Sequence, residues 1–360
     1  MIHSLPRSVW IVLALACGSG PAEPVEIERM DGLQGFEAAL DSLRVALEIP
    51  AFGVAIAKDE QIVWSRGLGY SDIEEGVLAT GVTSFHLASL TKTFASTVIM
   101  QLVEQGLVDL DDPVTDYGID LPSSGVIRVR HLLNHTSEDV PGSYYRYDGS
   151  RFAQLDRVIE HATGRTFADL LNERILRPLD LRHTAPNVRQ PTAFAVTGLG
   201  LADFQHNMAK PYELEGGGVV ASEYPSYFGV SAGLIASARN MARYSIAIDQ
   251  GQFLQPATWD SVFTPAISND GETLPYGLGW FIYWNQGVKF EWHYGWWNAN
   301  SSLIVRVPQQ QLTFIVLANT SRLSAAYGLG GDANLMRSHV AKLFVDAFVF
   351  GSEPLPQGHQ

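Results

Sequence analysis

Strand-like segments lie near both ends of this 360-residue chain, and a long, mainly helical region separates them. Near the N-terminus, residues 52–57 and 61–66 flank the turn Lys58-Asp59-Glu60, a pattern that predicts a hairpin. Apolar residues at helical spacing predict a helix over 33–47 and a last helix over 333–350. Further strand-like segments of the C-terminal region are 279–283, 288–293, 301–307 and 312–318. The pattern predicts an α/β fold in which both ends of the chain complete one sheet layer and a helical subdomain is inserted.

The N-terminus has the features of an export signal. His3 and Arg7 precede the apolar run Val9–Ala16, which is too short to span a bilayer as a stable helix. Cys17 follows directly and is the only cysteine, so the chain has no internal disulfide or thiolate metal cluster. The placement resembles a bacterial lipobox, although such boxes usually carry Leu where Ala14 stands. We expect lipidation of Cys17, membrane attachment, and location in the periplasm or cell envelope of a bacterium; plain secretion and an uncleaved anchor are the alternatives.

The expected domain boundaries follow from these two patterns. We expect one domain over residues 32–351, preceded and followed by segments outside it. The segments outside it are a signal peptide over 1–16, a tether over 17–31 and a tail over 352–360. The domain itself consists of a sheet subdomain over about 32–80 plus 272–351 and a helical subdomain over about 81–271.

Composition limits the classes of partner. Hydrophobic residues make up 46% of the chain, enough for a large core. The net charge of -14 would repel phosphates and argues against a nucleic-acid partner. We expect no cofactor.

Ser89-Leu90-Thr91-Lys92 begins an amphipathic helix that Gly106 ends. Because residues three apart lie on the same face of a helix, the hydroxyl of Ser89 and the amine of Lys92 should meet there. A serine needs a base to take its proton, and a partly desolvated lysine can serve as one. The pair therefore indicates a serine nucleophile, whereas a capping serine beside a solvated lysine is the structural alternative.

Two other catalytic arrangements compete with this pair. Gly229-Val230-Ser231-Ala232-Gly233 matches the nucleophile elbow of α/β-hydrolases, and Asp260 and His293 follow in the required order. However, a broken, loop-like segment precedes Ser231 where an elbow requires a strand, so we expect Ser231 to be a packing residue near the cleft. His131 and His135 lie four apart but lack the glutamate of a metalloprotease helix, so we expect no metal site.

The segments around Ser89 resemble the family of β-lactamases, penicillin-binding proteins and related esterases, above all its class C members, from about Leu33 to Phe350. The resemblance implies a β-lactamase/transpeptidase-like fold, with an antiparallel sheet flanked by N- and C-terminal helices. The supporting segments are Ile49–Ile56, Met100–Gly106, Leu110–Val114, Arg130–Ser137, Gly279-Trp280 and Val316–Asn319. Glu138 departs from the pattern, because the family continues there with Gly.

The family's second element is Tyr-x-Asn, and the matching stretch here is Tyr147-Asp148-Gly149. The resemblance implies that Tyr147 passes the proton between the nucleophile and the leaving group, together with Lys92. Gly149 replaces the asparagine that orients the substrate and the lysine. Asp148 is a candidate replacement, but adjacent positions rarely point the same way.

The third element is His-x-Gly in the esterase-like members, and His293-Tyr294-Gly295-Trp296 matches it. The resemblance implies that Gly295 lets the strand approach the substrate and that the N–H groups of Trp296 and Ser89 form an oxyanion hole. His293 would join the proton network of Tyr147 and Lys92 or bind a substrate carboxylate. We expect Tyr294, Trp296 and Trp297 to narrow the cleft or line it with aromatic rings.

The leading hypothesis is therefore an exported serine hydrolase that cleaves a small ester or amide through an acyl-enzyme on Ser89. A D-amino-acid peptidase acting on D-peptides, or a β-lactamase, is the alternative on the same site. Gly149 and Glu138 also leave open a non-catalytic sensor that binds a wall ligand or penicillin.

Overall fold

A computed structural model describes residues 12–13, 25–26, 32–329, 333–351, 353 and 355. The predicted signal peptide, Cys17, the tether and the tail therefore lie largely outside the described residues. Within them, β1 (Val12–Leu13) pairs antiparallel with β2 (Val25–Glu26). Among the residues described, none of the helices combines the length and the apolar character that a membrane span requires.

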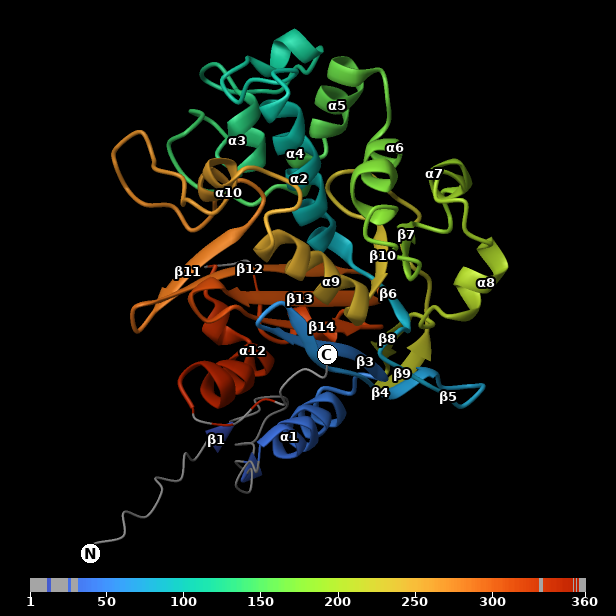
Figure 1. The fold of residues 1–360 in the computed structure, drawn as a ribbon. Coiled ribbons are helices and arrows are strands. Elements are labelled where there is room, and N and C mark those ends of the chain that lie inside the picture. Colours follow the sequence, from blue (N-terminus) through green and yellow to red (C-terminus); the bar gives the residue numbers. More distant parts are fainter. Residues whose placement is uncertain are drawn as a thin grey trace, which may run out of the picture.

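A seven-stranded antiparallel sheet forms the middle layer of the molecule (Figure 1). Both ends of the chain contribute to it, as predicted, because β14 pairs with β3 along their whole length. In spatial order the strands are β11 Phe281–Asn285, β12 Val288–Trp297, β13 Asn300–Val307, β14 Leu312–Ala318, β3 Ala51–Lys58, β4 Gln61–Asp72 and β5 Val77–Leu78.

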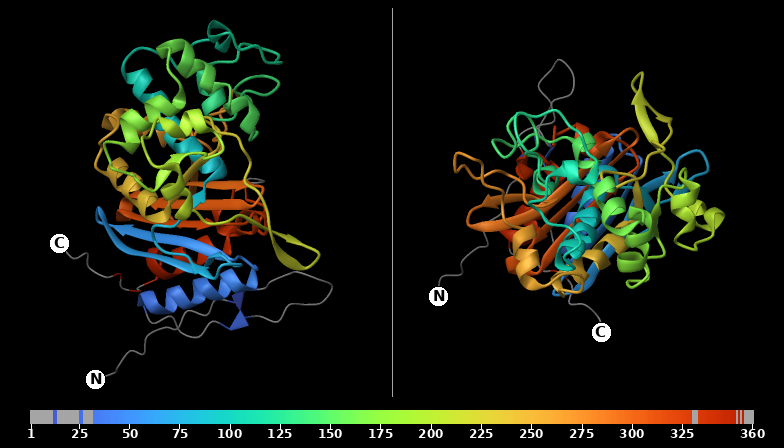
Figure 2. Two further views of the ribbon diagram at one scale, coloured as in Figure 1. Left: turned by 90° about the vertical axis from the view of Figure 1, so that its right-hand side faces the viewer. Right: turned by 90° about the horizontal axis from the view of Figure 1, so that it is seen from above.

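The terminal helices cover one face of this sheet (Figures 1 and 2). Phe36 of α1 (Gly32–Ala46) packs edge-on against Phe314 of β14, with ring centroids 5.7 Å apart. The predicted last helix over 333–350 is broken into three pieces. They are the 3₁₀ turn Leu335–Arg337, α12 His339–Phe344 and the π-helical turn Val345–Val349.

The region between β5 and β11 covers the other face and is mainly helical, as predicted. Helical residues 149–152 and 155–163 are separated by a break after Phe152. The helices are α2 Thr91–Glu104, α3 Val129–Leu133, α4 Gly149–Phe152, α5 Leu155–Thr163, α6 Phe167–Leu171, α7 Pro191–Ala195, α8 Leu201–His206, α9 Ala238–Asp249 and α10 Pro256–Val262, with α11 Arg322–Ala325 after the sheet. Shorter helical turns are Ala88–Leu90, Val114–Tyr117, Asn172–Leu176 and Pro308–Gln310.

Short strands that the sequence analysis missed also lie in this region. β6 Ser84–His86, β10 Leu234–Ser237 and β7 Thr184–Pro186 form a three-stranded sheet. β8 Tyr212–Glu215 and β9 Gly218–Ala221 form a hairpin that projects from the body (Figure 2). Strands this short carry too few residues to show an alternating pattern.

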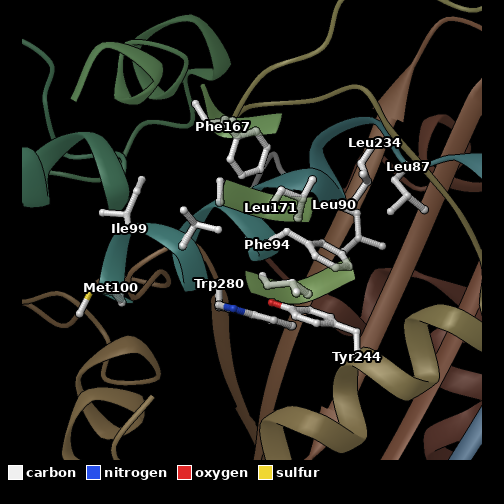
Figure 3. Packing of buried hydrophobic residues seen from close by; sticks show 14 of the residues in the cluster. Leu87, Leu90, Phe94, Ile99, Met100, Phe167, Leu171, Leu234, Tyr244 and Trp280 are labelled. Carbon is white, nitrogen blue, oxygen red and sulfur yellow. The ribbon is translucent and has the colours of Figure 1, made fainter. Parts of the chain in front are cut away.

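Helix α2 lies in the core of the helical region. Every residue from Thr91 to Met100 is buried, although the sequence predicted a helix with one solvated face. Phe94 stacks on Tyr244 of α9 with ring centroids 3.9 Å apart, and Figure 3 shows both rings close to Trp280. This packing on all sides fixes the start of α2 relative to the sheet.

Candidate active site

A strained turn precedes Ser89 and presents it at the start of α2. Ala88 has a φ of +48°, a conformation that residues with a Cβ rarely adopt. Neighbouring groups hold the turn: the Ala88 N–H donates to His86 Nδ1 at 3.1 Å, and Thr91 Oγ1 donates to the Ala88 carbonyl at 2.7 Å. Ser302 Oγ of β13 donates to the Leu87 carbonyl at 2.7 Å.

Lys92 is fully buried directly beside the serine, as its spacing predicted. Its Nζ lies 3.0 Å from Ser89 Oγ and donates to the main-chain oxygen of Ser231 at 2.7 Å. Burial lowers the pKa of Lys92 to about 7, and the carboxylate of Asp148 opposes this shift. A large fraction of the amine is therefore neutral near neutral pH, so it can accept the serine proton.

Tyr147 lies on the other side of the lysine. Its ring centroid is 5.1 Å from Lys92 Nζ, and its buried hydroxyl has no hydrogen-bond partner among the described residues. Burial and the neighbouring Tyr294 raise the pKa of Tyr147 well above its usual value, while the nearby hydroxyl of Ser89 lowers it. The structure thus brings Ser89, Lys92 and Tyr147 together and keeps the tyrosine protonated.

Gly149 lies over the lysine, where the family carries asparagine. A Cβ built on Gly149 would come within 3.8 Å of Lys92 Nζ, so the position points at the amine. Asp148 does not replace the missing amide, since its carboxylate caps α4 by accepting from the N–H groups of Ser150 at 2.7 Å and Arg151 at 3.0 Å. The oxygen that holds Lys92 is instead the Ser231 carbonyl.

Glu138, the second departure from the family pattern, has a structural partner. Its carboxylate lies 3.3 Å from Nε of Arg151, and both side chains are largely buried. The same guanidinium donates to the carbonyls of Ser137 at 2.8 Å and Pro122 at 2.6 Å. Glu138 therefore forms an ion pair with Arg151 of α4.

The placement of His293 corrects part of its predicted role. The side chain is 0% exposed, so it cannot reach a substrate carboxylate. Its Nδ1 donates to the Tyr294 carbonyl at 2.7 Å, and its Nε2 accepts from Tyr276 Oη at 2.7 Å. Burial and the nearby Lys92 lower the pKa of His293 to about 3 and keep the ring neutral. Both nitrogens are thus bound to groups other than Lys92 and Tyr147.

Gly295 brings β12 against the turn that carries the serine. A Cβ at this position would lie only 2.0 Å from the Leu87 carbonyl oxygen and 2.3 Å from Ser302 Oγ. Only glycine allows this approach. β12 also runs to Trp297, four residues beyond the end predicted from the sequence.

A cleft of about 510 Å³ opens above the serine. Trp296 and Trp297 line it, as predicted, whereas Tyr294 is only 6% exposed and packs into the core. The lining residues are Ser89, Lys92, Gly149, Ser150, Ala153, Gln154, Tyr227, Ser231, Ala232, Trp296 and Trp297.

Ser231 borders the cleft but does not form a nucleophile elbow. The residues before it, 222–228, form no strand, and the segment after it enters β10 instead of a helix. Asp260 is exposed, and His293 is bound to Tyr276 and Tyr294.

A carboxyl group that the sequence analysis missed, that of Asp156, lies behind the lining residues Ser231 and Tyr227. Ser231 Oγ donates to Tyr227 Oη at 3.3 Å, and Tyr227 Oη donates to Asp156 at 3.4 Å. Asp156 also accepts from the Val230 N–H at 3.2 Å, and burial raises its pKa to about 7. No motif pointed to Asp156, because it occupies an ordinary first-turn position of α5.

The two histidines considered as a metal pair serve the backbone. His131 Nδ1 accepts from the Arg128 N–H at 3.1 Å, and His135 Nδ1 accepts from the Asp148 N–H at 3.2 Å. In the part of the chain that the structure describes, no three His, Cys, Asp or Glu side chains gather as a metal site.

The chain is similar to several known proteins. The sequence model of the family described as Beta-lactamase matches residues 36–329. Penicillin-binding protein 4* of Bacillus subtilis (strain 168) is 26% identical over 309 residues, which are 74% of this chain and 67% of that protein. Another curated relative is matched over only 60% of its length, so the chain spans roughly two thirds or less of these proteins.

Two solved structures share the fold. The octameric penicillin-binding protein homologue from Pyrococcus abyssi has a TM-score of 0.76 and 22% identity, covering 89% of this chain and 78% of that one. The D-amino acid amidase from Ochrobactrum anthropi SV3, complexed with L-phenylalanine amide, has a TM-score of 0.70 and 20% identity, covering 88% and 99%.

Proposed function

The chain belongs to the Beta-lactamase family of serine hydrolases, and from this premise we propose that it cleaves an ester or amide through an acyl-enzyme formed on Ser89. The observation that carries the proposal is the 3.0 Å contact between Ser89 Oγ and the buried Nζ of Lys92. Burial of the amine supplies a base near neutral pH, which a solvated lysine would not.

In the first step, neutral Lys92 takes the proton of Ser89 as Oγ attacks the substrate carbonyl carbon. The resulting oxyanion lies between the N–H groups of Ser89 and Trp296. The C–O or C–N bond then breaks, and the leaving group receives the proton of the Lys92 ammonium through the hydroxyl of Tyr147. In the second step a water molecule, deprotonated by the same groups, releases the acid and restores the serine.

Esters rank above β-lactams in this proposal. The strand at the cleft carries His293-Tyr294-Gly295 instead of Lys-Thr-Gly, and two tryptophans follow it. A D-amino-acid peptidase on the same site is the second candidate, favoured by the predicted export signal.

Labelling with a neutral fluorophosphonate, followed by peptide mass spectrometry, tests the nucleophile. We expect an adduct on Ser89 in the wild type and in Ser231→Ala, and none in Ser89→Ala. Persistent labelling of Ser89→Ala, or loss of labelling in Ser231→Ala, would overturn the assignment. Turnover of a p-nitrophenyl ester that is lost in Ser89→Ala and Lys92→Met separates an enzyme from a sensor, which would be acylated once without turnover.

Export and lipidation of Cys17 are part of the proposal. Bacteria that express the full chain in the presence of a radiolabelled fatty acid should label it, and Cys17→Ala should not be labelled. Equal labelling of both would contradict the lipobox assignment.

A further inference from the structure

We propose that the cleft selects electrically neutral substrates that carry an aromatic group, and that it rejects substrates with a carboxylate beside the scissile bond. The inference rests on the proposed function and defines its substrate class: neutral aryl esters and amides, as opposed to β-lactams and peptides with a free C-terminal carboxylate.

Aromatic side chains form the walls of the cleft. Trp296 and Trp297 are 47% and 36% exposed, although tryptophan at a protein surface is usually covered. The Trp297 and Tyr227 rings, which both line the cleft, lie 6.1 Å apart at an interplanar angle of 56°. An aromatic group of a substrate would bury both indoles and stack on them.

The residues that line the cleft provide no accessible cation for a substrate carboxylate. Among the described residues that line the cleft, Lys92 has the only basic side chain. It is 0% exposed, is committed to Ser89 and the Ser231 carbonyl, and has a pKa of about 7. A carboxylate in the cleft would therefore lose its hydration without gaining an ion pair.

Two other basic side chains near the site are also not available to a substrate. His293 is fully buried, and its pKa of about 3 keeps it neutral. Arg151 lies one residue after the lining residue Ser150, but its guanidinium turns away from the cleft to Glu138 and two carbonyls. Glu138, where the family carries glycine, thus holds the Arg151 guanidinium together with these two carbonyls.

The titratable group behind Tyr227 is a carboxyl group, and its raised pKa of about 7 leaves it only partly ionised near neutral pH. Asp156 lies behind Tyr227, which donates to it at 3.4 Å, and its ionised form would repel a second carboxylate across the ring. The net charge of -14 acts in the same direction over a longer range.

A matched pair of esters tests the proposal on the full chain. The phenyl and 3-carboxyphenyl esters of phenylacetylglycine differ by one carboxylate on the leaving group. We expect kcat/KM, divided by the spontaneous hydrolysis rate of each ester, to be at least 50-fold higher for the phenyl ester. A ratio within threefold, or one that favours the carboxylated ester, would overturn the proposal.

The outcome is distinguishable from failure of the proposed function. If Ser89 takes up the neutral fluorophosphonate and both esters are cleaved equally, only the selectivity is wrong. If Ser89 is not labelled and neither ester is cleaved, the hydrolase assignment fails and the selectivity with it.

A cation placed in the cleft should reverse the preference. Trp297→Arg is expected to raise the relative kcat/KM of the 3-carboxyphenyl ester at least tenfold. Trp284→Arg is the matched control, because Trp284 is 56% exposed on β11 and pairs with Lys289, eight residues along β12 from Trp297. The control should keep the wild-type ratio, and an equal change in both variants would assign the effect to overall charge and contradict the proposal.

Discussion

At the scale of single residues, the chemistry depends on one buried amine. Lys92 has two oxygen neighbours, Ser89 Oγ and the Ser231 carbonyl, and lies over the rings of Tyr147 and Phe152. Aromatic faces and a carbonyl stabilise the ammonium only partly, so desolvation decides its pKa. The carboxylate of Asp148 acts on this amine as a charge and not as a hydrogen-bond partner.

The pH dependence of catalysis tests whether desolvation and the charge of Asp148 set the pKa of Lys92. Because only the neutral amine accepts the serine proton, kcat/KM for a neutral ester should rise about tenfold per pH unit below a midpoint near pH 7 and level off above it. Asp148→Asn removes the charge that raises the pKa of Lys92, while asparagine still caps α4. The midpoint should therefore move to lower pH, with activity at pH 6 about two- to threefold above wild type. A midpoint that stays in place or moves upward would contradict the electrostatic role of Asp148.

At the scale of elements, the site forms where the end of β12 crosses the turn before α2. Two hydroxyls connect the parts: Ser302 Oγ donates to the Leu87 carbonyl, and Ser324 Oγ of α11 donates to the Gly295 carbonyl at 2.8 Å. The crossing leaves no room for a side chain at Gly295. The strand and the serine turn therefore have one relative position, which the proposed oxyanion hole requires.

Gly295→Ala should separate these two elements. The added Cβ would force the strand away from Leu87, and overpacking of this kind costs about 1–3 kcal/mol of unfolding free energy. We expect esterase activity to fall at least 100-fold, because the strand that carries the Trp296 N–H moves away from the Ser89 turn. Gly218→Ala on β9 is the control, since its Cβ would meet nothing within 4 Å. Thermal unfolding and p-nitrophenyl ester turnover of both variants measure the effect, and equal behaviour would exclude a steric role for Gly295.

At the scale of the whole molecule, the sheet has a core on each face and the site lies where its edge meets the helical region. Successive residues of β13 belong to different cores: Leu303 lies in the core on one face of the sheet and Ile304 in the core on the other. Among the residues that the structure describes, three histidines are fully or almost fully buried: His86, His135 and His293. Burial lowers the pKa of each, to about 4 for His86 and about 3 for His293.

Acid should therefore unfold the protein well above the pKa values of ordinary carboxylates. Below pH 6.5 the unfolded chain binds protons at these histidines that the folded chain does not, so stability falls as the pH drops toward 4. Asp156 acts in the opposite direction on stability. Its pKa is raised to about 7, so the folded chain binds one proton there over the same pH range. We expect a net loss of about 4 kcal/mol between pH 6.5 and 4.5, measured by urea unfolding.

His293→Gln should reduce this loss by about 2 kcal/mol, because glutamine does not titrate. His206→Gln is the matched control, since this histidine is exposed and its replacement should leave the pH dependence unchanged. An identical pH dependence in wild type and His293→Gln would show that burial of His293 does not govern acid stability.

The sequence by itself determined the local relations. Ser89 and Lys92 meet because helical geometry places residues three apart on one face. The core strands were recognisable because β3 and β14 are nearly continuous apolar runs that become buried. Neither relation depends on the rest of the chain.

Tertiary structure alone decided the environment of these residues. The Ser231 carbonyl reaches Lys92 across 139 positions of sequence, and Asp156 reaches Val230 across 74. Local patterns contain no information on such contacts, so the lysine was predictable while the group that holds it was not. The same reason explains His293, whose motif indicated a site residue although the packing of Tyr276 and β12 buried it as a neutral ring. Charge, burial and therefore substrate preference are set by neighbours that only the fold brings together.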